Sequence, residues 1–175
     1  MNAMLFTLST FVSLAVLSYG HSDLQNKTLV AKKAGVVVTL TMTKFSKTEL
    51  AELWKRNIGY QYWGLIDCDN LKDWKAMNGN PWIVRGLKIT IRGKQVDSYG
   101  SSYMGLTEPL SVSILRATSE KAVFEIVGSD AGGSYTAEYF VNNSELVTRV
   151  VRSGEFPTLT WEKDTYHYVH SKDIN

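Results

Sequence analysis

Charged side chains near the C-terminus could perform acid–base chemistry: Arg152, Glu155, Glu162 and Asp164, with Glu125 and Glu138 on earlier segments. Two carboxylates whose surroundings differ can act as a general acid and a general base, as hydrolases and isomerases require. Opposite charges on neighbouring strands are, however, usually cross-strand pairs on a solvated face, each contributing roughly 0.2–1 kcal/mol. We therefore predict a polar cluster that locks the sheet, and we keep a catalytic pair as the alternative. The cluster would contain Arg152, Glu155, Glu162 and Tyr166.

Metal binding would depend on three histidines, His21, His167 and His170. If a leader is removed after Gly20, His21 becomes the first residue, and its amine and imidazole can chelate copper together with a further imidazole. On a strand, His167 and His170 point to opposite faces because they are three residues apart, so they cannot share an ion there. We predict that the histidines lie at frayed ends and hold no metal, with His21 as the weak candidate.

Nucleophilic and cofactor chemistry find little support in the sequence. Cys68 lies between Asp67 and Asp69, and the nearby negative charge disfavours the thiolate that a nucleophile requires. The chain has no Gly-x-Ser-x-Gly motif. The glycine-rich residues 128–133 lie between two expected strands and lack the helix that would follow a phosphate loop. We predict no cofactor.

Aromatic side chains form a second group that could carry function. Five of them fall in expected loops: Tyr60, Tyr62, Trp63, Tyr99 and Tyr103. Large rigid rings among Ser, Gly and Asn suit a contact surface, because they supply area at a low cost in conformational entropy. The alternative is that these rings fill the core beneath the helices. As a surface they predict a protein, a glycan or a small apolar ligand as the partner.

Length, charge and the N-terminal segment limit the class of protein. Residues 4–17 form an apolar stretch, and the small residues Ser18 and Gly20 lie at the positions that a signal peptidase reads, which is typical of a signal peptide of residues 1–20. The apolar run is shorter than the ~20 residues that span a membrane, so we predict no integral membrane segment after cleavage and a secreted or periplasmic location. Residues 21–175 then form a single domain with one cysteine and no internal disulfide. The net charge is +2 and the lysines are scattered, so we predict no nucleic-acid partner.

Periodicity predicts the elements that must position these residues. Residues 36–43 alternate apolar and polar side chains within a strand-like segment, residues 29–45. Ser46 and Glu49 match a capping box, and Leu50, Leu53 and Trp54 follow at helical spacing. A second, shorter helix is expected over residues 70–77.

The remainder of the chain predicts strands separated by turns. The expected strands cover residues 82–92, 94–98, 110–116, 121–127, 134–141, 145–152 and 161–169. Short strands at this spacing are typical of an antiparallel meander. The predicted fold is therefore mainly β, with about eight strands in a sandwich or partial barrel and two short helices inserted after the first strand.

The C-terminal part of the chain resembles a group of uncharacterised small exported bacterial β-proteins. The resemblance covers residues 88–168 and is carried by the run from Arg149 to Pro157 (RVVRSGEFP), by Trp161-Glu162 and Thr165-Tyr166, and by the turn Gly133-Ser134-Tyr135. The group carries no assigned activity. The resemblance therefore implies export and a meander fold.

Three functional hypotheses follow. The first is an exported binding module without catalytic activity, which would engage an envelope protein or a glycan. One version is an inhibitor of a cell-wall hydrolase, since residues 132–135 (GGSY) are similar to the segment that small exported lysozyme inhibitors insert into the enzyme. The second is a carboxylate-dependent hydrolase or isomerase in a barrel-like fold. The third is a structural subunit of an envelope assembly that uses exposed strand edges.

Overall fold

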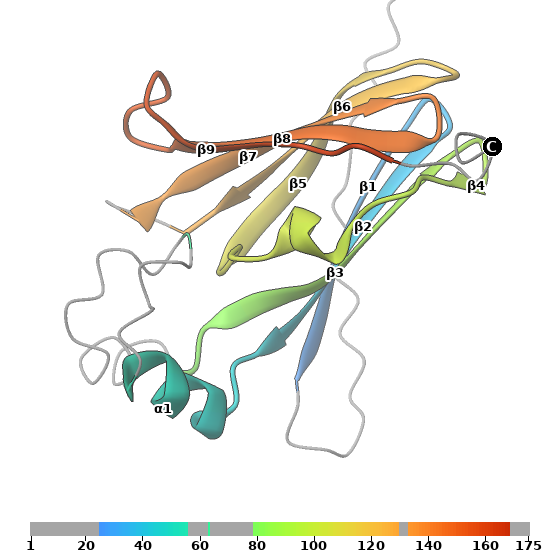
Figure 1. The fold of residues 1–175 in the computed structure, drawn as a ribbon. Helices are drawn as coiled ribbons and strands as arrows, with labels where there is room; N and C mark the ends of the chain where they lie inside the picture. Colours follow the sequence, from blue (N-terminus) through green and yellow to red (C-terminus); the bar gives the residue numbers. More distant parts are fainter. Residues whose placement is uncertain (1–24, 56–62, 64–78, 130–132, 169–175) are drawn as a thin grey trace, which may run out of the picture.

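The computed structural model describes residues 25–55, 63, 79–129 and 133–168. Within these residues nine strands form two antiparallel sheets, with one α-helix and one short 3-10 helix outside them (Figure 1). The sheets have the orders β1-β2-β3-β4 and β5-β6-β7-β8-β9, and they do not close into a barrel. The predicted class, a mainly β antiparallel sandwich, is confirmed. No helix among the described residues is long and apolar enough to span a membrane.

The first sheet contains one strand more than its sequence suggested. It consists of β1 (Asn26–Lys33), β2 (Val36–Lys44), β3 (Trp82–Ile91) and β4 (Lys94–Gln95). A tight turn at Ala34 and Gly35, both with positive φ, folds β2 back onto β1 in register. Turns of this kind usually carry Asn-Gly or Asp-Gly, so Ala-Gly gives a weak signal. The first helix consequently follows the second strand, which corrects the expected position after the first.

Helix α1 (Lys47–Lys55) begins where the sequence predicts. The main-chain N–H of Ser46 donates to Glu49 over 2.8 Å, and the N–H of Glu49 donates to the Ser46 hydroxyl over 3.1 Å. This reciprocal pair satisfies two N–H groups that the first turn leaves without a helical partner. Leu50 and Leu53 are buried on its inner face. The expected second helix, residues 70–77, lies outside the described residues.

The second sheet is a five-stranded meander. It consists of β5 (Pro109–Ala117), β6 (Lys121–Gly128), β7 (Tyr135–Asn142), β8 (Glu145–Ser153) and β9 (Thr160–Thr165). Among the described strands, each one of this sheet is hydrogen-bonded to its neighbours in the sequence. Both hairpins expected between residues 110 and 152 are present in the predicted order. The last strand ends at Thr165, before the expected residue 169.

The apolar faces of the two sheets pack against each other and form the core. On β2 the buried Val36, Val38, Leu40 and Met42 alternate with more exposed threonines, as the period-two pattern predicts. On the opposite sheet Phe124 and Tyr139 are neighbours across β6 and β7, and their ring centroids lie 4.6 Å apart. The 3-10 helix η2 (Gly100–Tyr103) lies between the sheets (Figure 1).

Polar contacts at Lys33 and after β4 help to join the sheets. The Lys33 ammonium at the end of β1 donates to the carbonyl oxygens of Ile114 (3.2 Å) and Leu115 (2.9 Å) on β5. After β4, the N–H of Asp97 donates to the Ser144 carbonyl over 2.7 Å, and the N–H of Leu146 donates to the Asp97 carbonyl over 2.9 Å. The chain that leads into η2 is therefore attached to the beginning of β8.

Candidate functional site

A cleft of about 520 Å³ opens between β9 and the segment that contains η2. Its lining includes Met104, Arg149, Glu162, Asp164 and Tyr166. Consecutive residues of β9 contribute, so the cleft runs along this strand. Within the described residues β9 is the last strand in its sheet, and none of them forms a strand along its other side.

Arg149 is the central side chain of the cleft. It lies on the inner face of β8, directly opposite Asp164 and next to Glu162 on β9, and only 3% of its surface is exposed. Its Nε donates to Asp164 over 2.9 Å, and its Nη2 approaches Glu162 at 2.5 Å and Asp164 at 2.8 Å. A planar guanidinium with five donors suits such a pair of carboxylates.

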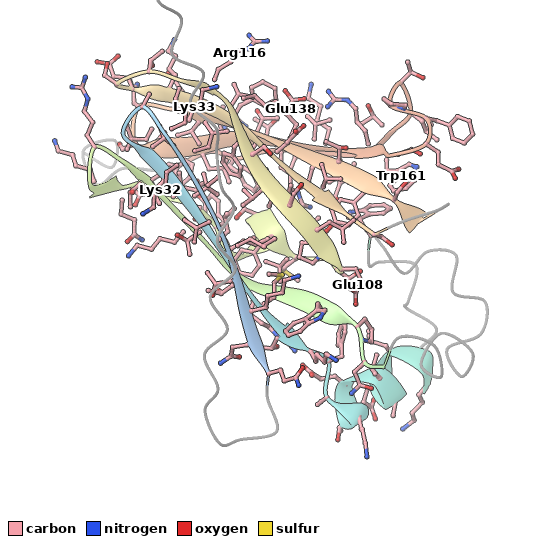
Figure 2. The ribbon with its side chains drawn as sticks, turned by 180° about the vertical axis from the view of Figure 1, so that it is seen from behind. Lys32, Lys33, Glu108, Arg116, Glu138 and Trp161 are labelled. Carbon is pink, nitrogen blue, oxygen red and sulfur yellow. The ribbon has the colours of Figure 1, made fainter. Side chains whose placement is uncertain are left out.

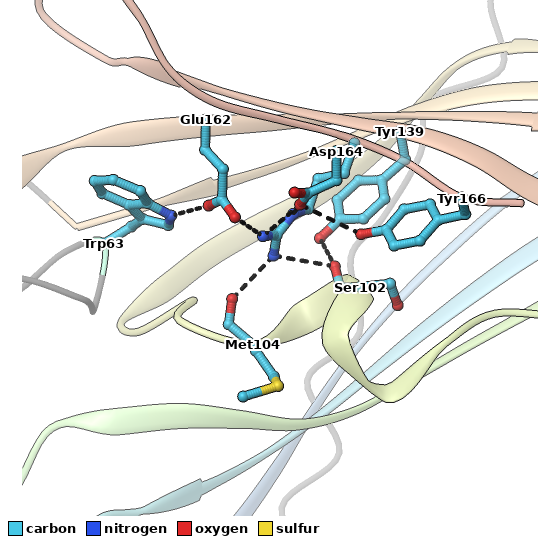
Figure 3. Close-up of polar contacts among 8 residues, drawn as sticks. Trp63, Ser102, Met104, Tyr139, Glu162, Asp164 and Tyr166 are labelled. Carbon is cyan, nitrogen blue, oxygen red and sulfur yellow. Dashed lines mark hydrogen bonds and ion pairs between the residues drawn. The ribbon is translucent and has the colours of Figure 1, made fainter.

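The remaining guanidinium nitrogen, Nη1, forms hydrogen bonds to the main chain on the opposite side of the cleft. Arg149 Nη1 donates to the main-chain carbonyls of Ser102 (3.3 Å) and Met104 (2.9 Å), as Figure 3 shows. The hydroxyl of Tyr139 donates to the same Ser102 carbonyl over 2.8 Å. One buried side chain therefore joins β9 to the segment around η2, and all three of its nitrogens are engaged.

Glu162 also connects the cleft to Trp63. Its Oε2 accepts the Trp63 indole N–H over 2.7 Å, while its Oε1 accepts from Arg149. The Trp63 ring stacks on Trp161, with centroids 5.3 Å apart. The Thr107 hydroxyl donates to the Trp63 carbonyl, which fixes the main chain at this residue. Both Glu162 carboxylate oxygens are thus occupied by protein donors.

Asp164 is less fully engaged. Its Oδ2 accepts from Arg149 and, at 3.5 Å, from the Tyr166 hydroxyl. Its Oδ1 accepts no hydrogen bond from the described residues, and 34% of the Asp164 side chain is exposed. Asp164 is therefore the carboxylate that can accept from a ligand in the cleft.

Burial sets the protonation of the groups around Arg149. Burial by itself would lower the pKa of Arg149, but Tyr139 and the carboxylates outweigh this effect and raise the pKa, so the guanidinium stays charged. Burial raises the pKa of Tyr166 to about 12, with Arg149 opposing the increase. Burial likewise raises the pKa values of Tyr135 and Tyr139 above their ordinary value of 10.0.

These tyrosines predict a loss of stability at alkaline pH. In the unfolded chain tyrosine titrates near pH 10, whereas in the folded protein Tyr135 and Tyr139 keep their protons at higher pH. Above about pH 10 the unfolded state therefore binds fewer protons, and the free energy of unfolding falls as pH rises. Each fully buried tyrosine contributes up to about 1.4 kcal/mol per pH unit. Urea titrations between about pH 8 and pH 11 measure this slope; Tyr139→Phe should flatten it, and a constant free energy would contradict the prediction.

The charged residues expected to form one cluster lie on two faces of the sheet. Arg152 donates to Glu138 over 2.8 Å on the outer face, which is a cross-strand ion pair of the expected kind. Glu162 lies on the inner face with Arg149. Glu155 is exposed in the turn after β8, and Tyr166 is half-buried beside Asp164. The structure thus places Arg152, Glu155 and Glu162 apart.

The structure also places the described aromatic candidates in different surroundings. Trp63 and Tyr103 are half-buried and pack against the core. Tyr99 is 42% exposed and stacks on Tyr168, with centroids 4.9 Å apart. Tyr60 and Tyr62 lie outside the described residues.

Arg149 is the functional residue that the sequence prediction missed. In the segment LVTRVV, Arg149 occupies an inward position of the strand. Glu162 and Asp164 are two residues apart in the next strand, so they share one face of it. A charged residue at an inward position was the available signal, but its partners depend on the pairing of β8 with β9.

The described residues contain no cluster that could hold a metal ion. His167 is exposed, and His21 and His170 lie outside the described residues.

Comparisons of this chain with protein-family models, with curated proteins and with solved structures found no match. The function is therefore inferred from the geometry of the cleft.

Proposed function

We propose that this protein is an exported binding module without catalytic activity, and that the cleft along β9 binds a neutral, hydroxyl-rich ligand, which is the chemistry of a glycan. The observation that carries the proposal is the partly exposed carboxylate of Asp164, held in place by buried Arg149 in a cleft of about 520 Å³. A fixed carboxylate oxygen is a strong acceptor for a sugar hydroxyl.

The charges of the cleft favour a neutral ligand. Arg149 lies between Glu162 and Asp164, with Lys163 on the same strand, so the positive and negative charges are equal in number. Such a cleft exerts little net attraction on an ion of either sign. All three nitrogens of the guanidinium are already bonded to protein acceptors, so Arg149 does not offer a ready anion site.

Apolar contact is available beside these acceptors. The Met104 side chain is 64% exposed and lines the cleft, and the half-buried Tyr166 lies across from it. Ligand sites typically combine apolar walls with a few fixed polar groups. A saccharide presents both C–H faces and hydroxyl groups, which matches this combination.

Catalysis is less well supported. A hydrolase or an isomerase needs one acid and one base whose surroundings differ. Glu162 and Asp164 instead accept from the same guanidinium nitrogen and are exposed to a similar extent, 32% and 34%. The inhibitor version is also less favoured, because Tyr135 of the similar segment is fully buried and is not available for insertion into an enzyme.

The proposal is tested by titrating the full chain with a panel of neutral oligosaccharides built from glucose, mannose, xylose or N-acetylglucosamine. Met104→Ala keeps the carbonyl that Arg149 uses and removes only the exposed side chain, so it should weaken binding about five- to tenfold without unfolding the domain. Asp164→Asn should weaken it about tenfold or more.

Leu110→Ala, at a comparably exposed apolar position on β5, is the matched control. It should bind like the unmodified chain, and thermal unfolding of each variant checks the fold. The absence of binding at millimolar saccharide, or equal binding by the Met104 and Leu110 variants, would overturn the assignment of the cleft.

A further inference from the structure

The two sheets differ sharply in charge. The segments that form the first sheet and its turns, residues 26–44 and 82–95, contain Lys27, Lys32, Lys33, Lys44, Arg85, Lys88, Arg92 and Lys94 but no Asp or Glu. Strands β5 to β9 instead carry acidic and basic residues in equal number. The net charge of +2 conceals this segregation, because the basic excess of one sheet is offset elsewhere in the chain.

The register of the first sheet shows which cations face outward. Lys88 lies opposite Thr39, and Lys32 lies opposite Val37, at positions that alternate with the buried Val36, Val38 and Ile89. Lys32 and Lys88 are therefore on the outer face, and both are exposed. Lys33 has the opposite parity, and its ammonium donates hydrogen bonds to carbonyl oxygens of β5 (Figure 2).

The outward cations gather near one end of the sheet. The N–H of Arg92 donates to the Gly35 carbonyl over 2.8 Å, so the turn between β3 and β4 adjoins the turn between β1 and β2. This brings Lys32 and Arg92 to the same end, whereas Lys94 lies opposite the buried Ile91 and therefore has the inward parity. Lys32 and Lys88 are two strands and two residues apart, which corresponds to about 12 Å between their Cα atoms. We call Lys32, Lys88 and Arg92, with the adjoining Thr39 and Thr90, the basic face.

No ion pair neutralises this group within the described residues. Arg85, farther along β3, pairs with Glu49 at the start of helix α1, whereas the three cations of the basic face make no salt bridge within the described residues. Unpaired cations about one Debye length apart act together on an anionic chain that passes over them. Threonine hydroxyls between them can donate hydrogen bonds to a polymer and accept hydrogen bonds from it.

The side chains around the cations favour one class of polyanion. The outward positions of β1, β2 and β3 that alternate with the core hold no aromatic ring, so they lack the stacking platform of a single-stranded nucleic-acid site. The large apolar side chains that are exposed among the described residues lie outside the first sheet, so this face lacks the apolar anchors of a bilayer-bound protein. Lysine, arginine and threonine on a sheet face suit a chain of charged sugars.

We propose that the basic face binds an acidic polysaccharide, a polymer that carries carboxylate or sulfate groups along a hydroxyl-rich chain. The site is separate from the cleft along β9, and it rests on charge segregation between the sheets. A module with both sites would hold an acidic glycan on one sheet and a neutral saccharide on the other.

The test measures binding of the full chain to alginate and to heparin, with neutral dextran for comparison. The variant Lys32→Gln/Lys88→Gln/Arg92→Gln should bind both polyanions at least about tenfold more weakly, and its affinity should depend less steeply on salt. The control Arg116→Gln/Lys121→Gln/Arg152→Gln removes three cations from the other sheet, all outside the cleft, and should retain most of the affinity.

Equal losses in the two triple variants would overturn the proposal, because they would indicate attraction to net charge alone. Tighter binding to single-stranded DNA or to phosphatidylglycerol vesicles than to alginate and heparin would overturn it in favour of those partners. Asp164→Asn separates the two sites, since it should leave alginate binding unchanged whether or not the cleft binds neutral saccharides.

Discussion

Replacing Arg149 by Met will lower the free energy of unfolding by about 3–5 kcal/mol, the usual cost of removing one partner from a buried ionic group. The substitution leaves Glu162 and Asp164 side by side without their cation. It also removes the donor to the carbonyls of Ser102 and Met104, which detaches the wall of the cleft. Urea unfolding monitored by tryptophan fluorescence measures the change.

Two further variants make this expectation specific. Adding Glu162→Gln and Asp164→Asn to Arg149→Met removes the uncompensated charges and should recover part of the lost stability. Arg152→Met breaks a partly exposed pair on the outer face and should cost only about 1 kcal/mol. If Arg149→Met costs no more than Arg152→Met, Arg149 does not hold the cleft together.

Gly128→Ala will destabilise the protein by about 3 kcal/mol, at the upper end of the usual cost of overpacking. Gly128 lies directly opposite Tyr135 on β7, and an added Cβ would come within 2.3 Å of the tyrosine ring. The ring cannot easily move, because it is fully buried and its hydroxyl donates to the Thr107 carbonyl over 2.9 Å. The midpoint and slope of urea unfolding measure this cost.

A second glycine and a double variant serve as the comparison. At Gly100 an added Cβ would meet its nearest neighbour, the Tyr103 hydroxyl, only at 4.0 Å, so Gly100→Ala should change stability little. In a Tyr135→Val background the ring is gone, and Gly128→Ala should then cost much less than it does alone. Additive costs in this double-mutant cycle would show that the ring is not the obstacle.

The elements of the fold are largely readable from local patterns. The capping box at Ser46 and Glu49 and the alternation of residues 36–43 are short-range signals, and each specifies its own element. The turn at Ala34 and Gly35 was missed because its left-handed conformation is adopted here by a residue that rarely adopts it. Sandwich packing followed from the number and spacing of the strands.

The candidate site was harder to predict because it depends on pairing between strands. Strand parity placed Glu162 and Asp164 on one face, but Arg149 and Arg152 have opposite parity, and only the register shows which of them meets the carboxylates. The basic face was hard to predict for the same reason, because it also depends on how the strands pair. Its cations are scattered along the sequence as singles, and the topology of β1 to β4 collects them.

The carboxylates of β9 also bear on how the protein behaves when it is crowded. A strand at the edge of a sheet offers unpaired N–H and C=O groups to any other strand, which is a common route to aggregation. Among the residues that the structure describes, β9 occupies that position and directs two charged side chains, Glu162 and Asp164, toward the inside of the sandwich. A strand added from another molecule would bring its own inward side chains against these charges and against Arg149. The charged residues that line the cleft therefore also disfavour the addition of a strand from another molecule at this edge.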